Sequence, residues 1–391
     1  MPDIQPVESE DTGVSVWVVV AVFVAAAALL SVPLWFLIQA ALEADPTPAA
    51  DVSGEETSEV APLDDTDGTG ELLTESAGVD LPEGVVGVVV GTVALDTDVE
   101  GTVLMTPGAT LDCGGHTIRG SGTQAGVIMA NDATVRKCLI SGFNTGVALT
   151  TSDGALVENI EVTNSRIGFY LVNGTTNATI TGSTAAGNEI GYLFEASVSS
   201  VHIEANTAVR NWRSGFMIGF TTNSAFINNE AIEGGSGFWI TNSRSNTFLG
   251  NRVTGASEWF SFGLFENTSD NVVENNEVTR GGVAFALGSG AAENSLRANT
   301  ATNASKGYDL SGGARNNELV DNASIGAHDG FWVGDNAGRA NVLAGNYSEG
   351  STNWGFVDLT TGLNGDFGTN STYSNNVCVD NGSDATPAQL C

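Results

Sequence analysis

Three side chains of this chain are the candidates for acid–base catalysis: His202, Glu204 and Asp309. His202 and Glu204 flank Ile203 in the run SVHIEAN, so on a strand both would point to the same side, about 7 Å apart. A histidine beside a carboxylate can exchange protons near neutral pH. Such a pair is also an ordinary solvent-facing arrangement, and both interpretations stay open.

Asp309 is the one carboxylate among the middle positions of a repeated Gly-Φ-x-Φ motif, in which Φ is an apolar residue. In a strand of this pattern the first and third apolar positions point inward and the middle one points outward. The two facing carboxylates of a glycosidase are therefore not predicted on this surface. Catalytic residues remain unassigned, with His202, Glu204 and Asp309 as candidates.

The other middle positions predict an outward apolar row with aromatic members. Aromatic faces on such a surface are typical of sugar-binding sites. Solvent-facing or covered side chains are the alternative interpretation. The middle positions are Ala148, Tyr170, Leu193, Met217, Trp239, Leu264, Asp309, Trp332 and Val357.

Charged and aromatic residues in the turns before each motif provide a second set of binding candidates. Together with Tyr170, Met217, Trp239 and Trp332, the residues Arg213, Lys306 and His328 are the candidates for ligand binding. The turn residues are Arg166, Arg213, Glu258, Lys306, His328 and Asp329, with Trp212, Trp259 and Trp354 beside them.

No metal or cofactor is predicted. The run CGGH at Cys113 to His116 has metal-like spacing, but two ligands do not make a site. There is no phosphate-binding GxxxxGK[ST] loop, HExxH motif or convincing nucleophile triad. Nucleic acid is excluded as a partner by the formal charge of −33, from 46 acids against 13 bases. Only two of those bases are lysines, and this acidic, lysine-poor composition predicts a halophilic source, with an acidic linker and a GC-rich genome as the alternative.

The first hundred residues carry 20 acids and no Lys or Arg, and they divide into three segments. A short tail covers residues 1–13. The uncharged run Val14–Leu42 is long enough to cross a hydrocarbon core of about 30 Å, and it predicts a membrane anchor. A cleaved signal peptide is the alternative, although its apolar region would be shorter and would follow a basic start. Residues 43–80, with 12 acids and no hydrophobic period, predict a disordered linker.

The remaining chain repeats a pattern that appears in Gly237–Asn251, GFWITNSRSNTFLGN, and again in Gly330–Asn346. An apolar residue stands three positions before a small polar one, eleven times, at spacings of 21 to 30 residues. A period near 23 is typical of a solenoid, and short alternating runs broken by Gly, Asn and Ser favour strands over helices. We therefore expect residues 81–391 to form an all-β parallel β-helix of about 11–12 coils with a C-terminal cap.

The recurring asparagines predict a ladder that closes one turn of every coil. Coils stack about 4.8 Å apart, so equivalent side chains lie over one another and can bond their neighbours. In the Asn-x-Φ-x-x-Asn form of the repeat, only the second Asn is assigned to the ladder. The ladder members are Asn159, Asn206, Asn229, Asn251, Asn276, Asn299, Asn322, Asn346 and Asn376.

Four cysteines fall into two near pairs, and they predict disulfides formed outside the cytoplasm. Cys113 and Cys138 are 25 residues apart, about one coil, so stacking brings them together. Cys378 and Cys391 would then join the tail to the last coil. Because terminal coils lack a neighbour, both bonds are expected to close the ends of the solenoid.

The runs ATLDCGGHTIRGSG (Ala109–Gly122) and ATVRKCLISGFNTGV (Ala133–Val147), followed by the repeat, resemble right-handed parallel β-helix proteins of the pectin-lyase-like superfamily. The likeness covers about residues 84–385 and is greatest to NosD-like and generic β-helix-repeat members. It implies the right-handed fold, but the superfamily has many activities. We expect a membrane-anchored, extracytoplasmic protein of the cell envelope that binds carbohydrate or another surface. The alternatives are a polysaccharide lyase, hydrolase or epimerase, and a NosD-like accessory protein for an envelope metalloenzyme. Four Met and three His make the accessory role less favoured.

Overall fold

The computed structural model describes residues 70–74, 81, 84–256, 260–361 and 370–391. Two compact units divide the chain at residues 64 and 65, and all described residues belong to the second. The predicted tail and membrane anchor, and residues 43–69 and 75–80 of the predicted linker, lie outside the described residues. Within the described part, no helix has the length and apolar character to cross a membrane.

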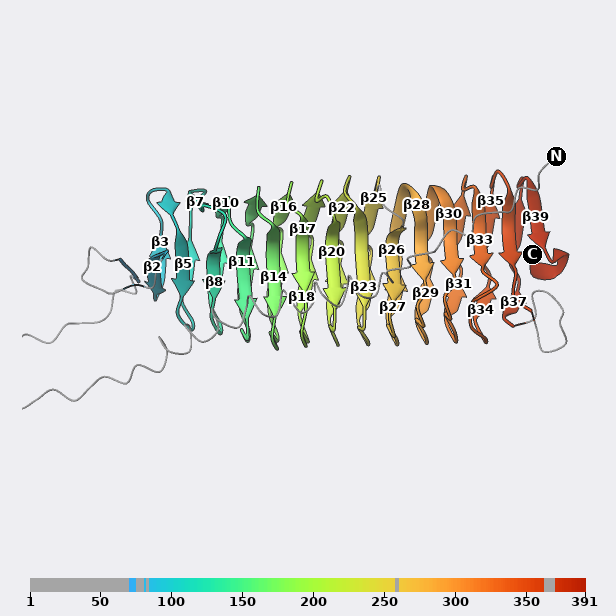
Figure 1. Ribbon diagram of the computed structural model, residues 1–391, viewed down its shortest axis with the longest axis horizontal. Coiled ribbons are helices and arrows are strands. Elements are labelled where there is room, and N and C mark those ends of the chain that lie inside the picture. The colour runs from blue at the N-terminus through green and yellow to red at the C-terminus, as the bar shows by residue number, and fades with distance from the viewer. Residues whose placement is uncertain (1–69, 75–80, 82–83, 257–259, 362–369) are drawn as a thin grey trace, which may run out of the picture. The chain divides into compact units, whose positions relative to one another are not determined.

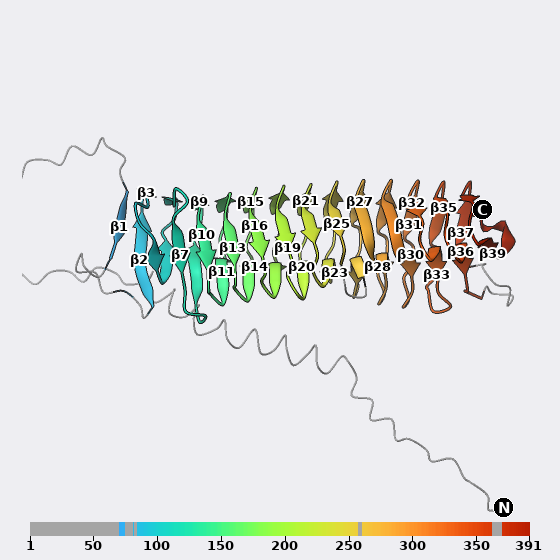
Figure 2. The ribbon, with the colours of Figure 1, turned by 90° about the horizontal axis from the view of Figure 1, so that it is seen from above.

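Described residues of the second unit form a right-handed parallel β-helix, as predicted. Successive coils follow one another along a single axis from β2 to β39 (Figures 1 and 2). Each coil contributes a strand in turn to a first, a second and a third face. The helical content of the described residues is one short 3₁₀ turn, η2, at Ala388–Leu390.

The first face is a 13-stranded parallel sheet of three-residue strands. Its strands are β3 (Thr92–Ala94), β6 (Thr110–Asp112), β9 (Thr134–Arg136), β12 (Leu156–Glu158), β15 (Thr179–Thr181), β18 (His202–Glu204), β21 (Ala225–Ile227), β24 (Thr247–Leu249), β27 (Val272–Glu274), β29 (Ser295–Arg297), β31 (Glu318–Val320), β34 (Val342–Ala344) and β37 (Thr372–Ser374). The eleven repeats found in the sequence correspond to β9 through β37, and two coils precede them.

The second face also consists of short parallel strands. They are β4 (Val99–Glu100), β7 (Thr117–Arg119), β10 (Leu139–Ser141), β13 (Glu161–Thr163), β16 (Thr184–Ala186), β19 (Thr207–Val209), β22 (Glu230–Ile232), β25 (Arg252–Thr254), the first parts of β28 (Glu277–Leu287) and β30 (Thr300–Leu310), β32 (Ala323–Ile325), β35 (Tyr347–Glu349) and β38 (Val377–Val379).

The third face has longer strands, and β28 and β30 bend from the second face into it. Its other strands are β2 (Val85–Val90), β5 (Thr102–Met105), β8 (Ala125–Met129), β11 (Thr145–Thr150), β14 (Ile167–Val172), β17 (Ile190–Phe194), β20 (Ser214–Gly219), β23 (Ser236–Thr241), β26 (Phe260–Phe265), β33 (Asp329–Val333), β36 (Trp354–Asp358) and β39 (Ser383–Thr386).

Inward side chains of the third face form a continuous stack of nine aromatic rings through the core. The rings lie in register on successive coils, with neighbouring centroids 4.5 to 5.7 Å apart. Both buried tyrosines of the stack donate their hydroxyl hydrogen to a backbone carbonyl, Tyr192 to Ser183 and Tyr308 to Asn299. Because each ring covers the next, the stack removes a large apolar area from water. Its members are Phe169, Tyr192, Phe216, Phe238, Phe262, Phe285, Tyr308, Phe331 and Phe356.

An asparagine ladder closes the turn between the first and second faces. Each buried amide accepts a hydrogen bond from the backbone N–H of the equivalent residue one coil earlier, at 2.8 to 3.0 Å, and donates to a backbone carbonyl. The ladder comprises Asn206, Asn229, Asn251, Asn276, Asn299, Asn322, Asn346 and Asn376.

Asn159 is not part of this ladder, which corrects the prediction. It is exposed and has a positive φ of 54°, a conformation that Asn tolerates at a turn. The inward residue of its coil is Val157, which pairs with Ile180, and the ladder position is taken by Ile160. The alignment was therefore displaced by one residue at this coil.

A second ladder, which the sequence analysis did not assign, lies at the turn between the third and first faces. It is formed by the first Asn of Asn-x-Φ-x-x-Asn, with N–H···Oδ1 distances of 3.0 to 3.2 Å. Its members are Asn246, Asn271, Asn294, Asn317 and Asn341. The pattern therefore repeats because each Asn satisfies buried turn groups of the neighbouring coil.

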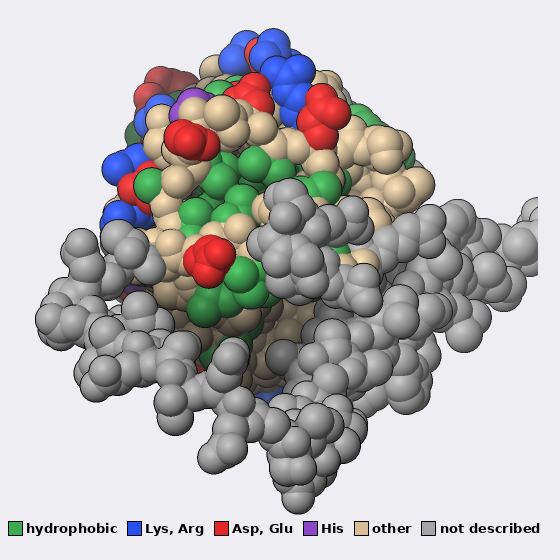
Figure 3. Space-filling view, turned by 90° about the vertical axis from the view of Figure 1, so that its left-hand side faces the viewer, with side chains coloured by type: hydrophobic (Ala, Val, Ile, Leu, Met, Phe, Trp, Pro, Cys, Tyr) green, Lys and Arg blue, Asp and Glu red, His purple; other side chains and the backbone are tan. Residues whose placement is uncertain are grey.

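At the N-terminal end of the solenoid, apolar side chains gather in the middle of the exposed end (Figure 3). Strand β1 (Glu71–Leu73) pairs antiparallel with β2, and Leu72 packs against the core. These residues fall within the predicted linker 43–80, so ordered structure begins earlier than predicted there. Further along, Cys113 and Cys138 form a disulfide with Cα atoms 4.8 Å apart.

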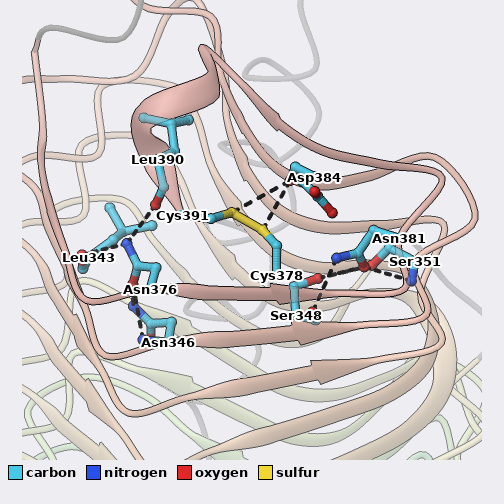
Figure 4. The surroundings of a disulfide bond; sticks show 10 residues. All are labelled: Leu343, Asn346, Ser348, Ser351, Asn376, Cys378, Asn381, Asp384, Leu390 and Cys391. Carbon is cyan, nitrogen blue, oxygen red and sulfur yellow. Dashed lines mark hydrogen bonds between the residues drawn. A yellow bond between two sulfur atoms is a disulfide. The ribbon is translucent and has the colours of Figure 1, made fainter.

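At the C-terminal end, Cys378 and Cys391 form the second disulfide, with Cα atoms 5.8 Å apart. The last turn folds back so that Leu390 is buried and its carbonyl accepts a hydrogen bond from Asn376 Nδ2 at 3.1 Å (Figure 4). The asparagine ladder therefore ends on the tail that this disulfide holds.

Candidate functional site

The outward side of the third face carries a row of residues at one register position on successive coils, which we call the outward row. Because parallel pairing repeats this position at every coil, the row runs along the solenoid axis and crosses the strands. Its members are Tyr170, Leu193, Met217, Trp239, Gly263, Ala286, Asp309, Trp332 and Val357.

Leu264 does not belong to the row, contrary to the sequence prediction. Trp239 pairs with Gly263, so Leu264 pairs with Ile240 and lies fully buried in the core. Ser261 occupies the place that a glycine holds in other coils, and Gly263 stands two residues later. Without a glycine at 261 to mark the start of the motif, the predicted middle position was displaced by one residue, from Gly263 to Leu264.

The N-terminal half of the row is less exposed than predicted. Leu193 is buried, and it packs with Ile167 and Ile190 in a small apolar cluster outside the core. Tyr170 and Met217 are half-buried against the same cluster. This part of the row is therefore a compact apolar surface, with Tyr170 and Met217 partly open to solvent.

Trp239, also half-buried, packs against an aromatic pair, Phe260 and Phe265, on the following coil. Its ring meets Phe260 edge-on at 5.6 Å, and Phe260 meets Phe265 at 4.7 Å. A Cβ at Gly263 would lie 2.3 Å from Phe265 and 2.6 Å from Phe260. Absence of a side chain at Gly263 therefore lets the two phenyl rings fold over the sheet and support Trp239.

Lys306, Asp309 and Trp332, three of the predicted site residues, meet in the C-terminal half of the row. Lys306 Nζ lies 2.8 Å from Asp309 Oδ2 and 4.2 Å from the centre of the Trp332 ring. The side chains of Lys306 and Asp309 are 25% and 15% exposed, so the pair is only partly hydrated. Asp309 Oδ1 is buried without a hydrogen-bond partner. The cluster thus combines a cation, an unsatisfied acceptor and an aromatic ring.

Two other predicted turn residues lie near this cluster in the chain but have their own partners. Asp329, which pairs with Lys306 across the strands, is buried and accepts a hydrogen bond from Asn353 Nδ2 at 2.9 Å. His328 is exposed, with Nδ1 3.0 Å from the hydroxyl of Thr352. His328 is therefore at the edge of the site, whereas Asp329 adds a negative charge beside it.

Glu195, which the sequence analysis did not select, contacts Tyr170 at the other half of the row. The Tyr170 hydroxyl donates a hydrogen bond to Glu195 Oε2 at 3.1 Å. Burial raises the pKa of Glu195 above its usual value, although the hydrogen bond from Tyr170 and the charges of Arg166 and Arg213 oppose this. Burial also raises the pKa of Tyr170, as does the Glu195 charge. A partly buried carboxyl with a raised pKa beside a phenol is a feature of acid–base sites.

The turn arginines are already partnered. Arg213 Nη1 lies 3.4 Å from Glu189 Oε1, and Arg166 Nε donates to Asn144 Oδ1 at 2.8 Å. Glu258 and Trp259 lie outside the described residues. Trp212 is 66% exposed in a turn beside the third face and is not a member of the row.

His202 and Glu204 lie on the first face, away from the outward row. His202 Nε2 is 2.9 Å from Glu204 Oε2, and each side chain is 43% exposed. Both side chains are therefore partly open to solvent. The structure does not bring His202 and Glu204 together with Asp309, so the three candidates do not form one catalytic group.

Residues 108–265 match the family described as periplasmic copper-binding protein (NosD). The donor set present does not fit copper, which is held by imidazole, thiolate and thioether groups. In the described residues no three His, Cys, Asp or Glu side chains are grouped as metal ligands, and the four cysteines are in disulfides. His116, His202 and His328 lie in three different coils, and Met105 and Met129 are buried in the core.

Two epimerases of known structure are similar in fold. The A-module of mannuronan C-5 epimerase AlgE6 of Azotobacter vinelandii has 16% identity and a TM-score of 0.54, over 76% of this chain and 91% of that chain. A mutant of the periplasmic alginate epimerase AlgG has 11% identity and a TM-score of 0.52, over 76% of this chain and 85% of that chain. At these identities the likeness is one of fold. A comparison with curated proteins finds no match.

The repeat, the stacked core and these matches agree, and we conclude that the chain is a parallel β-helix protein that matches the NosD family over residues 108–265.

Proposed function

We propose that this protein is an extracytoplasmic β-helix protein that binds a polysaccharide chain along the outward row of its third face. The observation that carries the proposal is the placement of Tyr170, Trp239 and Trp332 at one register position. Trp239 and Trp332 are four coils apart, about 19 Å at the usual strand spacing. A ligand that touches both rings must be extended and must run along the solenoid axis, as a glycan chain can.

The chemistry of the row supports this ligand class. Partly exposed aromatic rings offer apolar faces on which sugar rings stack. Lys306 and Asp309 stand beside Trp332 and offer a hydrogen-bond donor and an acceptor. Sites that combine apolar walls with a few polar groups are typical of small-molecule and oligosaccharide recognition.

Location outside the cytoplasm is supported by the two disulfides, which are rare in reducing compartments. The family that matches residues 108–265 is described as periplasmic. We further propose that Val14–Leu42 anchors the chain in the membrane, since it is uncharged and about long enough to span one. Protease added to intact cells should release the β-helix; its protection until the membrane is lysed would contradict this topology.

The binding proposal is tested by applying the full chain to a glycan array and measuring affinity for each hit by calorimetry. We expect Trp239→Ala and Trp332→Ala each to weaken binding roughly tenfold, because stacking on an aromatic ring contributes about 1 kcal/mol or more. Trp212→Ala is the matched control, since Trp212 is more exposed but lies outside the row. Equal losses in all three variants, or no glycan hit, would contradict the proposal.

A polysaccharide-active enzyme is the second candidate, favoured by the Tyr170–Glu195 pair with its raised pKa values. Each glycan that binds should be incubated with the chain and then analysed for cleavage, unsaturated ends or a changed sugar configuration. A new product that disappears in Glu195→Gln while glycan binding persists would support catalysis. An unchanged glycan would leave binding as the activity of this face.

A further inference from the structure

Charges beside the outward row indicate which glycans it accepts, an inference that rests on the proposed function. We propose that the row binds an uncharged polysaccharide, one that presents hydroxyl groups, and that it rejects polyuronates. Lys306 is already paired with Asp309 and Trp332, and this pairing sets the preference of the row.

Lys306, the lysine beside the row, already has two partners within the protein. Its ammonium group forms an ion pair with Asp309 at 2.8 Å and stands over the Trp332 ring. An arriving carboxylate would have to compete with Asp309 for this ammonium, and separating a partly buried pair leaves a charge without its counterion. Lys306 is therefore a poor receptor for a uronate group.

The arginines of the adjoining turns also have partners, so they do not serve as receptors for a uronate carboxylate in place of Lys306. Arg213 faces Glu189 at 3.4 Å, and Arg166 is bonded to Asn144 and lies within electrostatic reach of Glu195. Asp309 lies in the row, and the carboxylates of Glu195 and Asp329 border it. Residues 101–391 hold 26 acids and 13 bases, a net charge of 26 − 13 = 13 negatives. A polyanion would meet repulsion both at the row and from the whole domain.

The unsatisfied acceptor at Asp309 indicates which chemical group of a ligand this site can bind. Its Oδ1 has no partner, and a buried acceptor gains most from an N–H or O–H donor. The carboxylate torsion of Asp is soft and roughly two-fold, so one oxygen can turn to a ligand while the other keeps Lys306. A sugar hydroxyl donates to Asp309 and accepts from Lys306, whereas an ionised carboxylate only accepts.

Asp309→Asn separates the two ligand classes, because it removes a charge and keeps the shape. An uncharged glycan should bind roughly tenfold more weakly to this variant, since hydrogen bonds to a charged group are the stronger ones. A polyuronate should bind more tightly to it, because repulsion is relieved. Asp321→Asn is the control for net charge: Asp321 is exposed in a turn away from the third face, with a positive φ that Asn tolerates.

The decisive probes are an oligomannuronate and the same oligosaccharide with its carboxyl groups reduced to alcohols, applied beside the array hits. We expect array hits among uncharged glycans, and we expect their affinity to change by less than about twofold between roughly 0.1 and 1 M NaCl, where screening lengths fall from about 10 to 3 Å. Tighter binding of the unreduced than of the reduced oligosaccharide, or array hits confined to acidic glycans, would overturn the inference while leaving the proposed function standing. No binding to any glycan would instead overturn the proposed function itself.

Discussion

The side-chain oxygen of Asn276 accepts two hydrogen bonds from Asn251, one from its backbone N–H at 2.8 Å and one from its Nδ2 at 2.9 Å. In the same way, the backbone N–H and the Nδ2 of Asn276 both donate to the side-chain oxygen of Asn299, each at 2.9 Å. One buried amide therefore satisfies groups in its own coil and in both neighbouring coils.

Asn276→Leu should destabilise the fold by several kcal/mol. Replacing the amide removes the acceptor of the Asn251 backbone N–H, one of the two acceptors of Asn251 Nδ2, and a donor to the carbonyl of Phe248, and each buried group left unsatisfied costs about 1–3 kcal/mol. Urea unfolding followed by circular dichroism measures the loss. Thr247→Ala, at an exposed position of the first face, should change stability by less than about 1 kcal/mol. A loss as small for Asn276→Leu as for the control would contradict the ladder's stabilising role.

The sequence predicted the first ladder because its Asn recurs at nearly constant spacing, and identical positions stack in a parallel solenoid. It did not predict the second, although Asn246 stands in the same quoted repeat. Each member of the second ladder lies five residues before a member of the first, so both series recur at the same spacing. The signal was therefore present in the repeat, and only the second Asn of each motif was aligned.

Leu264→Ala should cost about 2–5 kcal/mol, because Leu264 is fully buried and its truncation leaves a cavity in the core. Trp239→Ala, on the outward side of the neighbouring coil, should cost less stability despite removing a larger side chain. Chemical denaturation of both variants measures the difference. If Leu264→Ala proved the milder change, the pairing of Leu264 with Ile240 would be wrong.

The local sequence of β26 did not determine the register in which β26 pairs with β23. Ser261 replaces the glycine that begins the motif in other coils, so the motif has no local mark there, whereas the inward Phe262 and Leu264 continue the two core columns of Phe238 and Ile240. The choice between the two alignments depends on filling the core column, which is a tertiary effect. For the same reason the contact between Tyr170 and Glu195 could not be predicted, since Glu195 lies after the motif and reaches back to the preceding coil. Lys306 was selected as a turn residue, and Asp309 and Trp332 as middle positions of the motif, but the contact among the three was not predicted.

Glu195→Gln should stabilise the fold more at neutral pH than at acidic pH. Because burial raises the folded-state pKa of Glu195, the folded state holds this proton to a higher pH than the unfolded state does. Stability from this group is present below the unfolded pKa and is lost as the pH rises through the folded pKa. Gln removes that loss and keeps an acceptor for Tyr170.

The measurement is the midpoint of thermal unfolding for the Glu195→Gln variant and the unsubstituted protein, each from about pH 4 to pH 7. The gain from substitution should increase with pH. Glu204→Gln, on the first face and 43% exposed, serves as the control. A gain that is flat with pH, or that decreases as the pH rises, would contradict a raised pKa for Glu195.

Replacing both Cys378 and Cys391 by Ser should loosen the last coil and leave the middle coils intact. The disulfide closes a segment with a sequence separation of 13, and a loop of about 15 residues contributes roughly 3 kcal/mol in the chain-entropy account. Without it Leu390 is held over the core by local contacts alone. Hydrogen exchange read by mass spectrometry should show faster exchange in residues 370–391.

The double variant Cys113→Ser with Cys138→Ser is the matched comparison, because it removes the other disulfide. Its faster exchange should be confined to the coils around β6 and β9. Uniformly faster exchange through the whole solenoid in either variant would show that the disulfides stabilise the fold globally rather than locally.

Each coil of the solenoid pairs only with the coil before it and the coil after it, so distance along the axis is counted in whole coils. A single-residue insertion in a turn leaves the spacing between Trp239 and Trp332 unchanged, whereas duplication of one coil of about 23 residues between them lengthens it by one step of about 4.8 Å. The length of the outward row is therefore set in steps of one coil. Its reach along a ligand can change in evolution, or by design, only through the gain or loss of complete coils.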